Sequence, residues 1–448
     1  MAWGADRLLT SARAAFGAPG ADGVEVLITR YDSALTRFAE SSVHQNVGRV
    51  DGEARIRVVV DGARIGVVVT NDLSDAGIRR AAAEAVEVAR VVPADEEFAG
   101  LARPAAAYPS AGVDDAETRA ATADVRAAAV GRLLSALPSD AVGAGTVETG
   151  SGEIGVVSST GVECYHRSTR ARLSLLGSGP DSTGYAEDAS GRLGDLDPDR
   201  LSRRVADKVQ RGRAPRAASP GDYAVVLEPA ATATLLQFLG WTAFGAKVVA
   251  EGRSPLSGRV GQVVCSPAVT IVDDPTSALL PGLPFDAEGV PTRRTDLIRD
   301  GVAVGVVHDL ASAHAAGVES TGHALPAPNP DGAMPLHLIM EPGSASLDEL
   351  VAGCERGLLI TRFHYTNVVH PIESTITGMT RDGTFLVEDG RIAGAVHNLR
   401  FTQSILGALS GVEEVGADTE LATELFFGAA RAPAVRLSRF AFTSTTTF

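Results

Sequence analysis

Apolar and polar positions alternate along two neighbouring segments near the start of the chain. Residues 56–62 read IRVVVDG and residues 65–71 read IGVVVTN, and Asp61 and Gly62 lie between the two apolar runs. An Asp-Gly pair in this position is typical of a β-hairpin. An earlier apolar run, VEVLITRY at 24–31, predicts a further strand. We therefore expect a mainly antiparallel sheet in this part of the protein.

Other segments repeat their apolar positions every 3.6 residues, which predicts helices over residues 5–16, 75–92, 114–137, 200–213 and 230–250. Asp75 stands where an N-cap would begin the second of these helices. The stretch 177–197 is rich in Gly, Asp and Ser and is predicted as a loop. Beyond residue 250, short apolar runs alternate with Gly and Pro, so we expect the second half of the chain to be rich in β-strands.

The expected fold class is α+β, with two domains. A chain of 448 residues is longer than the roughly 250 to 300 residues that one hydrophobic core usually supports. Residues 1–215 are predicted to form an α/β domain, with long helices on a mainly antiparallel sheet and a sub-boundary at the Pro- and Ala-rich residues 95–112. Residues 220–448 are predicted to form a β-rich domain.

The charge balance argues against several classes of partner. The formal net charge of −15 repels phosphate backbones, and no run of Lys or Arg offsets it, so we expect no nucleic-acid partner. No apolar run reaches the about 20 residues that cross a membrane. The N-terminal residues lack a basic region followed by an apolar one and carry Asp6, so we expect a cytoplasmic protein.

Histidine and cysteine spacing predicts no metal site. His364 and His370 are six residues apart, which on a strand separates them by roughly 20 Å. Glu319 and His323 have helical spacing, but nearby glycines weaken a helix there. The cysteines stand far apart without a CxxC pair, which argues against a disulfide framework or a thiolate zinc site; they are Cys164, Cys265 and Cys354.

Two acidic pairs remain as candidate site residues. Asp273 and Asp274 lie in TIVDDP, and Asp286 and Glu288 lie in PFDAEGVP. Such carboxylates could hold a cation or orient a peptide amine. As turn and cap residues they need no such role, and the sequence favours this second interpretation without excluding the first.

The segments around these acidic pairs resemble the TldD/PmbA family of metallopeptidase-like proteins. The similarity is most specific in EGRSPLSGRVGQVVCSPAVTIVDDPT and LPGLPFDAEGVPTRRTDLIRDGV, and it continues in STGHALPAPNP and DGTFLVEDGRIAGAVHNLRFTQSILGAL. It covers most of residues 221–448. The first domain is similar too, with weaker motifs, over QNVGRVDGEARIRVVVDGARIGVVVTND. The resemblance implies a β-rich C-terminal domain of the TldD/PmbA type.

The same resemblance implies that this chain lacks the family's catalytic motif. Active members carry HExxxH on the helix after the strand equivalent to YAVVLEP, with two zinc-binding histidines and a glutamate as general base. Here Gln237, Phe238 and Thr242 stand at those positions, and no residue of 230–250 is His, Glu or Asp. The cysteine that active members carry near the C-terminus has no counterpart after Cys354. We therefore expect neither a catalytic residue nor a metal in this chain.

The role that the resemblance implies is that of a noncatalytic TldE (PmbA)-type subunit. Such a subunit pairs with a zinc-dependent TldD-type peptidase, which holds the metal, and the two form a chamber for unfolded or modified peptides. A homodimer is compatible with the sequence when the partner is absent. The candidates for contacts with the peptide or with the partner are Asp273, Asp274, Asp286, Glu288 and His323.

Two other functions stay open at this stage. The chain could be an independent hydrolase, which requires that His323, His364, His370 and Cys354 converge in the fold. It could also be a regulator that binds other proteins, since its acidic charge permits protein partners.

Overall fold

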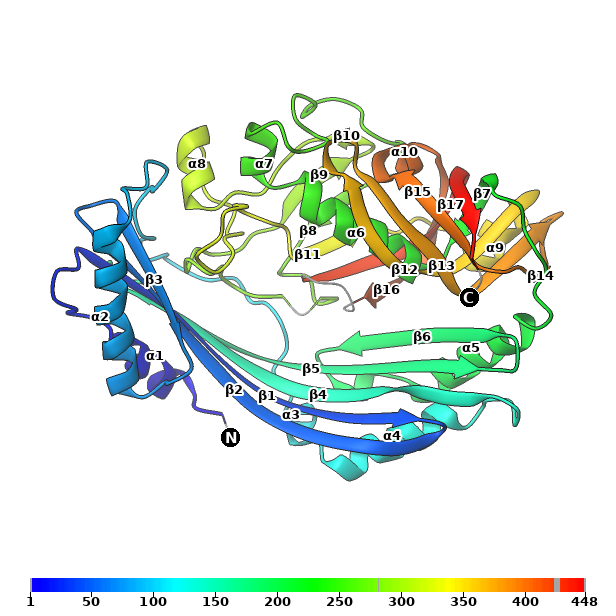
Figure 1. The fold of residues 1–448 in the computed structure, drawn as a ribbon, viewed down its shortest axis with the longest axis horizontal. Helices are drawn as coiled ribbons and strands as arrows, with labels where there is room; N and C mark the ends of the chain where they lie inside the picture. Colours follow the sequence, from blue (N-terminus) through cyan, green and yellow to red (C-terminus); the bar gives the residue numbers. More distant parts are fainter. Residues whose placement is uncertain (1, 281, 423–427, 447–448) are drawn as a thin grey trace.

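Two β-sheets with helices packed on them make up the protein (Figure 1). The structure is a computed structural model and describes residues 2–280, 282–422 and 428–446. Its long helices, its antiparallel first sheet and its larger mixed second sheet confirm the predicted α+β class.

The first sheet is antiparallel throughout. Its strands follow the spatial order β3 (Arg64–Thr70), β2 (Ser42–Val60), β1 (Gly23–Ala39), β4 (Val142–Ser158), β5 (Glu163–Ser178) and β6 (Thr183–Ser190). The predicted hairpin is confirmed, because Asp61 and Gly62 link β2 to β3 with positive φ angles of 49° and 77°. Several strands exceed 15 residues and extend well past their apolar runs, since backbone pairing continues through polar positions.

Helices cover the two ends of this sheet. Around α1 and α2 the core includes Leu8, Val26, Ile56 and Ala85, and around α4 and α5 it includes Val130, Leu133, Leu173 and Val205. In Figure 1 the sheet forms the lower half of the molecule and curves around the C-terminal half. The N-terminal helices are α1 (Ala5–Arg13), α2 (Asp75–Val91), α3 (Ala116–Ala120), α4 (Ala123–Leu134) and α5 (Pro198–Arg211), with a short 3₁₀ turn η1 (Leu193–Asp195).

Three predictions of local structure were wrong. The helix predicted over 114–137 is interrupted, because the Thr122 hydroxyl accepts a hydrogen bond from the backbone N–H of Val125 and begins α4 anew. The loop predicted over 177–197 contains β6, whose backbone pairs with that of β5. The helix predicted over 230–250 ends at Ala243, and a separate short helix follows.

The second sheet is larger and mixed. Strand β7 pairs in parallel with β12 and antiparallel with β17, so that β7, β12, β13, β15 and β17 close into a ring. The strands of the described residues are β7 (Gly221–Leu227), β8 (Ile271–Asp273), β9 (Thr295–Arg299), β10 (Val302–Ala303), β11 (His337–Met340), β12 (Arg356–His370), β13 (Thr375–Glu388), β14 (Arg391–Ala395), β15 (Leu399–Ser404), β16 (Val412–Ala422) and β17 (Ala429–Thr445).

Helix α6 (Pro229–Ala243) follows β7 directly and packs against β12 and β17. It is buried on nearly all sides, and its Leu235 and Leu239 belong to the same core cluster as Phe401 and Phe440. A helix that is apolar all round belongs in the interior of a protein. The remaining helical segments are α7 (Ala246–Ala250), α8 (Leu310–Ala316), α9 (Leu347–Ala352), α10 (Ile405–Ser410) and the 3₁₀ turn η2 (Pro371–Glu373).

A buried ion-pair network joins the two halves where α6 begins. The Lys208 ammonium on α5 donates to both carboxylate oxygens of Glu228, at 2.6 and 2.7 Å, and to the Thr361 hydroxyl at 2.8 Å. Arg204 bridges Glu228 and Glu420. Burial would raise the pKa of Glu228, but Lys208 and Arg204 outweigh it and lower the pKa to about 2. The network therefore fixes the start of α6 against the N-terminal half of the chain.

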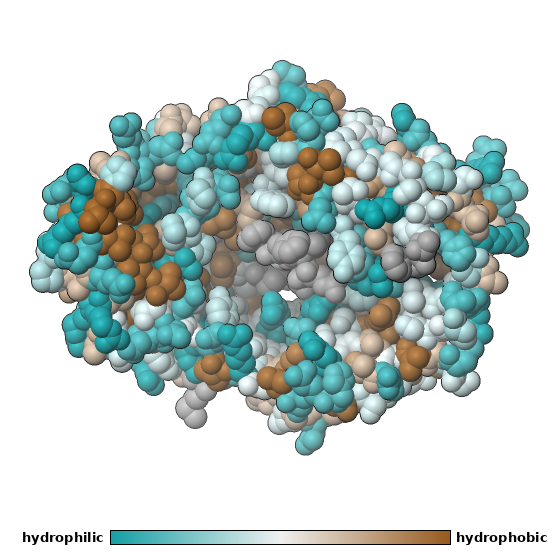
Figure 2. All heavy atoms as spheres, viewed as in Figure 1, coloured by the Kyte–Doolittle hydropathy of each residue, from teal (hydrophilic) through white to brown (hydrophobic). Residues whose placement is uncertain are grey.

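Figure 2 shows the residue hydropathy on one face of the molecule. In Figure 2 this face is mostly hydrophilic, with hydrophobic residues gathered at the left end. None of the helices in the described parts of the chain is long and apolar enough to cross a membrane.

Candidate functional site

The motif positions on α6 offer poor ligands for a metal ion. Both amide atoms of Gln237 are buried and have no hydrogen-bond partner. Phe238 is 4% exposed and packs near Trp241, with ring centroids 6.3 Å apart. The Thr242 hydroxyl donates to the Phe238 carbonyl oxygen at 2.8 Å. An amide, a phenyl ring and a hydroxyl already bonded to its own helix do not match the imidazole and carboxylate groups that zinc prefers. These residues do not fit a zinc site.

The residues of the independent-hydrolase hypothesis do not converge either. Cys354 packs in an apolar cluster with Leu350 and Phe385, and burial raises the pKa of its thiol. His364 and His370 lie along β12, and His323 is hydrogen-bonded elsewhere. In the described ranges, no group of three or more His, Cys, Asp or Glu side chains lies close enough to hold one metal ion.

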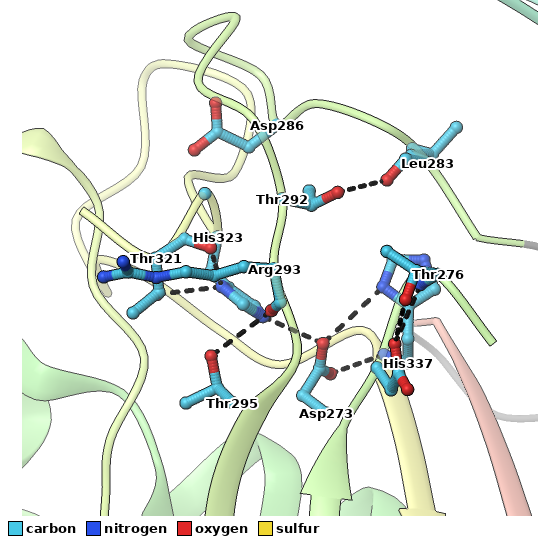
Figure 3. A network of polar contacts seen from close by, with 12 residues as sticks. Asp273, Thr276, Leu283, Asp286, Thr292, Arg293, Thr295, Thr321, His323 and His337 are labelled. Carbon is cyan, nitrogen blue, oxygen red and sulfur yellow. Dashed lines mark hydrogen bonds and ion pairs between the residues drawn. The ribbon is translucent and has the colours of Figure 1, made fainter. Parts of the chain in front are cut away.

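A buried polar network connects β8, β11 and the loop that precedes β11 (Figure 3). Asp273 ends β8 and is fully buried. Its Oδ1 lies 2.8 Å from Nε2 of His323, and its Oδ2 accepts the backbone N–H of His337 at 2.6 Å. Burial would raise the pKa of Asp273, but His323 and His337 outweigh it and hold the pKa well below its usual range. Asp273 is therefore a carboxylate under ordinary conditions.

A second buried carboxylate, Asp286, accepts hydrogen bonds from the backbone of its own loop and of the loop at Ala324. It accepts the backbone N–H groups of Glu288 and Val290 through Oδ1 and that of Ala324 through Oδ2, at 2.9 to 3.0 Å. Since Asp273 holds the side chain of His323 and Asp286 holds the N–H of Ala324, two aspartates fasten the same short segment. Burial, followed by the nearby Glu288, raises the pKa of Asp286.

Glu288 links this loop to the N-terminal sheet. Its carboxylate accepts from Arg57 of β2 at 3.2 and 3.3 Å and from the backbone N–H of Leu310 at 3.1 Å. Arg57 also donates to Glu25 of β1 at 2.9 Å. Burial raises the pKa of Glu288, and it raises the pKa of Glu25 to about 7 despite the neighbouring Arg57. The Arg57 guanidinium thus pairs with the carboxyl groups of both Glu25 and Glu288 where the two halves of the molecule meet.

The raised pKa of Glu25 predicts a pH dependence of stability. An unfolded glutamate titrates near about 4.3, so Glu25 in the folded state stays protonated up to a higher pH. Its contribution to stability is fully present below about pH 4.3 and is lost as the pH rises through 7, by about 4 kcal/mol in all. We expect urea unfolding of Glu25→Gln to show a smaller loss of stability between pH 5 and pH 8 than the unsubstituted protein. Parallel pH profiles for the two proteins would contradict the assignment.

The structure places the remaining sequence candidate in a turn. Asp274 accepts the backbone N–H and hydroxyl of Thr276 and lies 3.7 Å from Arg294. Asp273 and His323 are thus brought together, and Asp286 holds the backbone of the adjacent Ala324. Asp274 holds its own turn, and Glu288 contacts the N-terminal sheet. A role for these five residues in binding a peptide or a partner stays a prediction. Arg57, Glu25 and His337 were not found from the sequence, because their partners lie 32 to 231 residues away.

A cavity opens next to this region. It has a volume of about 570 Å³ and is bounded by the chain near Ala102, by the loop at Val290 to Arg293 and by α8. Its walls are mainly apolar, with Arg103, Arg293, His314 and Glu319 as the charged or titratable groups. A volume of this size accommodates a small ligand or a few side chains of a peptide.

Three family models match the chain in succession. The PmbA/TldA metallopeptidase C-terminal domain matches residues 220–444, domain 1 of the same family matches residues 24–89, and its central domain matches residues 109–213. The C-terminal match alone spans half of the chain.

Individual proteins resemble the chain at low sequence identity. A metalloprotease from Methanothermobacter thermautotrophicus is 28% identical over 50% of this chain and 49% of its own length. A TldD homologue from Haemophilus influenzae, named a metalloprotease, is 30% identical over 38% of this chain and 35% of its own length. The chain therefore spans half or less of these curated relatives. The crystal structure of TldE from Thermococcus kodakarensis superposes with a TM-score of 0.86 at 21% identity, over 98% of this chain and 99% of that one, which shows that the fold is shared.

Proposed function

Because the chain belongs to the PmbA/TldD metallopeptidase family, we propose that it is a noncatalytic subunit that pairs with a zinc-dependent TldD-type peptidase. In this proposal the partner supplies the metal and the catalytic residues. The present chain supplies part of the wall of a chamber in which unfolded or modified peptides are cut, and the complex acts in the cytoplasm.

The observation that carries the proposal is the chemistry of α6. The helix keeps its place after β7 and its close packing in the core, but its motif positions present Gln237, Phe238 and Thr242. None of these can hold zinc together with its neighbours, and Phe238 cannot accept a proton. Helix α6 is thus present and packed in the core, although it lacks the catalytic groups of the motif.

The burial and the contacts of three candidate residues support a structural role for them. Asp273 and Asp286 are buried and Glu288 is largely buried, and the three hold backbone segments and the contact between the two halves of the molecule. A protein that walls a chamber needs such a rigid frame more than it needs free carboxylates. Extended peptides can be gripped by backbone hydrogen bonding to strand edges, which tolerates many sequences.

The test is peptide cleavage by the purified chain, alone and mixed with a TldD-type subunit that retains HExxxH, together with metal analysis of both. We expect the chain alone to cleave nothing and to bind no stoichiometric zinc, and the mixture to cleave an unfolded peptide. Cleavage or stoichiometric zinc binding by the chain alone would refute the proposal. So would a mixture that neither associates nor cuts.

A variant at motif position Gln237 tests in addition whether α6 takes part in the reaction. Gln237→Met removes an unpaired buried amide, so it is expected to raise the free energy of unfolding by about 1 to 3 kcal/mol. It should leave cleavage by the mixture unchanged. A loss of cleavage with this variant would show that α6 still takes part in the reaction.

A further inference from the structure

The cavity beside α8 has no part in the proposed function. It lies between three segments that are far apart in the sequence: residues 99–103, the loop 290–293, and α8 with the residues that follow it. Its volume of about 570 Å³ falls within the range of sites that bind small molecules, roughly 300 to 1,000 Å³. The cavity is therefore large enough for a ligand of its own.

Hydrogen bonds outside the cavity hold each of its three walls in place. Glu288 accepts the backbone N–H of Leu310 at the start of α8, at 3.1 Å. The Thr292 hydroxyl donates at 2.6 Å to a backbone carbonyl oxygen nine residues earlier in its own loop (Figure 3). On the third wall, the Thr160 hydroxyl donates to the carbonyl oxygen of Ala102. A ligand thus meets a preformed cavity, and binding requires little ordering of the protein.

The charged groups of the cavity carry a positive balance in a protein whose formal net charge is −15. Two arginines, Arg103 and Arg293, face one carboxylate, Glu319, which leaves one positive charge when His314 is neutral. Arg293 is already engaged, because it lies 3.4 Å from the Glu319 carboxylate and donates to the Glu319 carbonyl oxygen at 3.2 Å. Arg103 is exposed and has no ion pair with any residue that the structure describes. Its guanidinium is available to an anion from solution.

The rest of the lining indicates the other part of the ligand. Most of it is apolar and includes Ala99, Val290, Leu310 and Val318. Such walls favour an apolar group, because its burial removes apolar surface of both partners from water. A planar guanidinium binds a carboxylate through two parallel hydrogen bonds, and a single carboxylate balances the one positive charge of the cavity.

We propose that this cavity binds a small carboxylate with an apolar body, and that Arg103 recognises the carboxylate. The volume suits a molecule of the size of a dipeptide or of a medium-chain fatty acid. These two sources share the same chemistry. The site is formed by this chain alone, so it goes beyond the proposed pairing with a peptidase subunit and does not depend on it.

The test is isothermal titration calorimetry of the full chain with two carboxylates, N-acetyl-leucyl-leucine and octanoate. We expect at least one of them to bind saturably with a dissociation constant below about 1 mM. Preference for the dipeptide would identify the end of a peptide as the ligand, and preference for octanoate would identify a free fatty acid. The neutral amide of N-acetyl-leucyl-leucine should bind at least about fivefold more weakly than the acid. The proposal is overturned if neither carboxylate binds saturably, or if the amide and the acid bind equally well.

Two variants locate the binding in this cavity. Arg103→Gln removes the free guanidinium, and Val318→Asp adds a negative charge at a wall position that is 53% exposed, so each should raise the dissociation constant by about fivefold or more. The matched control is Arg79→Gln, which removes an exposed arginine of α2 outside the cavity and should leave binding unchanged. Circular dichroism should show that all three variants are folded.

Binding that survives both Arg103→Gln and Val318→Asp would show that the carboxylate binds elsewhere, and the assignment of the cavity would be wrong. An equal loss of binding with Arg79→Gln would mean that the effect is one of net charge and not of this site. None of these measurements involves a peptidase subunit or peptide cleavage, so this proposal and the proposed function fail separately.

Discussion

Replacing Glu228 by glutamine is expected to lower the free energy of unfolding by about 3 kcal/mol at neutral pH, because it leaves the buried Lys208 ammonium without its counter-charge. The pKa of Glu228 gives a similar figure: a value of about 2 in the folded state against about 4.3 in the unfolded state corresponds to about 3 kcal/mol. Because the folded-state pKa is the lower one, this stability is present above about pH 4.3 and is lost as the pH falls toward 2.

Helix α5, which carries Lys208, also offers an exposed ion pair as a control. Arg211 pairs with Asp207 one turn away on α5, and both side chains are about half exposed, so Arg211→Ala should cost less than about 0.5 kcal/mol. Adding Lys208→Met to Glu228→Gln removes the unpaired charge and should recover most of the loss. Urea unfolding at pH 7 measures all of these differences. If Glu228→Gln cost no more than Arg211→Ala, the network would not be what joins the two halves.

Local features of the fold could be predicted from the sequence where side-chain chemistry alone decides them. The hairpin at Asp61 and Gly62 is one case, because residues that tolerate positive φ stand between two apolar runs. Strand β6 is the opposite case. Its sequence TGYAEDAS has the composition of a loop, and it forms a strand because β5 offers a continuous row of backbone partners. Pairing of this kind is a property of the neighbouring strand and leaves little trace in the sequence.

Of the candidate site, too, only the locally determined part could be predicted from the sequence. The motif positions on α6 could be placed because a strand-helix junction is a local pattern, and a family resemblance marked it. Asp273 and His323 were singled out separately, but their hydrogen bond spans 50 residues and could not be inferred from spacing. The contact of Arg57 with Glu288 spans 231 residues and joins two domains, so only the folded chain reveals it. Long-range polar contacts of this kind could not be predicted from the sequence.

These contacts also explain why buried carboxylates are common in a chain without a catalytic motif. Glu228, Glu288 and Asp273 each meet a cation or a donor from a distant segment. A buried charge is tolerated only when it is paired, so each of them specifies one arrangement of its two segments and penalises the others.

Replacing Asp273 by leucine is expected to be among the most destabilising single changes in the protein. The carboxylate accepts hydrogen bonds from the His337 backbone N–H and from His323, and both donors are buried. Each donor left without an acceptor costs about 1 to 3 kcal/mol, so the total loss should be about 2 to 6 kcal/mol. Because the substitution removes the hydrogen bond between Asp273 and the His323 side chain, amide hydrogen exchange should rise in residues 321–324 more than in α6.

Asp273→Asn separates hydrogen bonding from charge. The asparagine oxygen can still accept from the His337 N–H, and its amide can donate to Nε2 of His323 once the ring proton moves to Nδ1, which lies 2.9 Å from the Thr321 carbonyl oxygen. We therefore expect this variant to lose only about 1 to 2 kcal/mol. Denaturant unfolding of the two variants side by side decides the matter. Equal losses for leucine and asparagine would mean that the charge of Asp273, rather than its two hydrogen bonds, holds this segment in place.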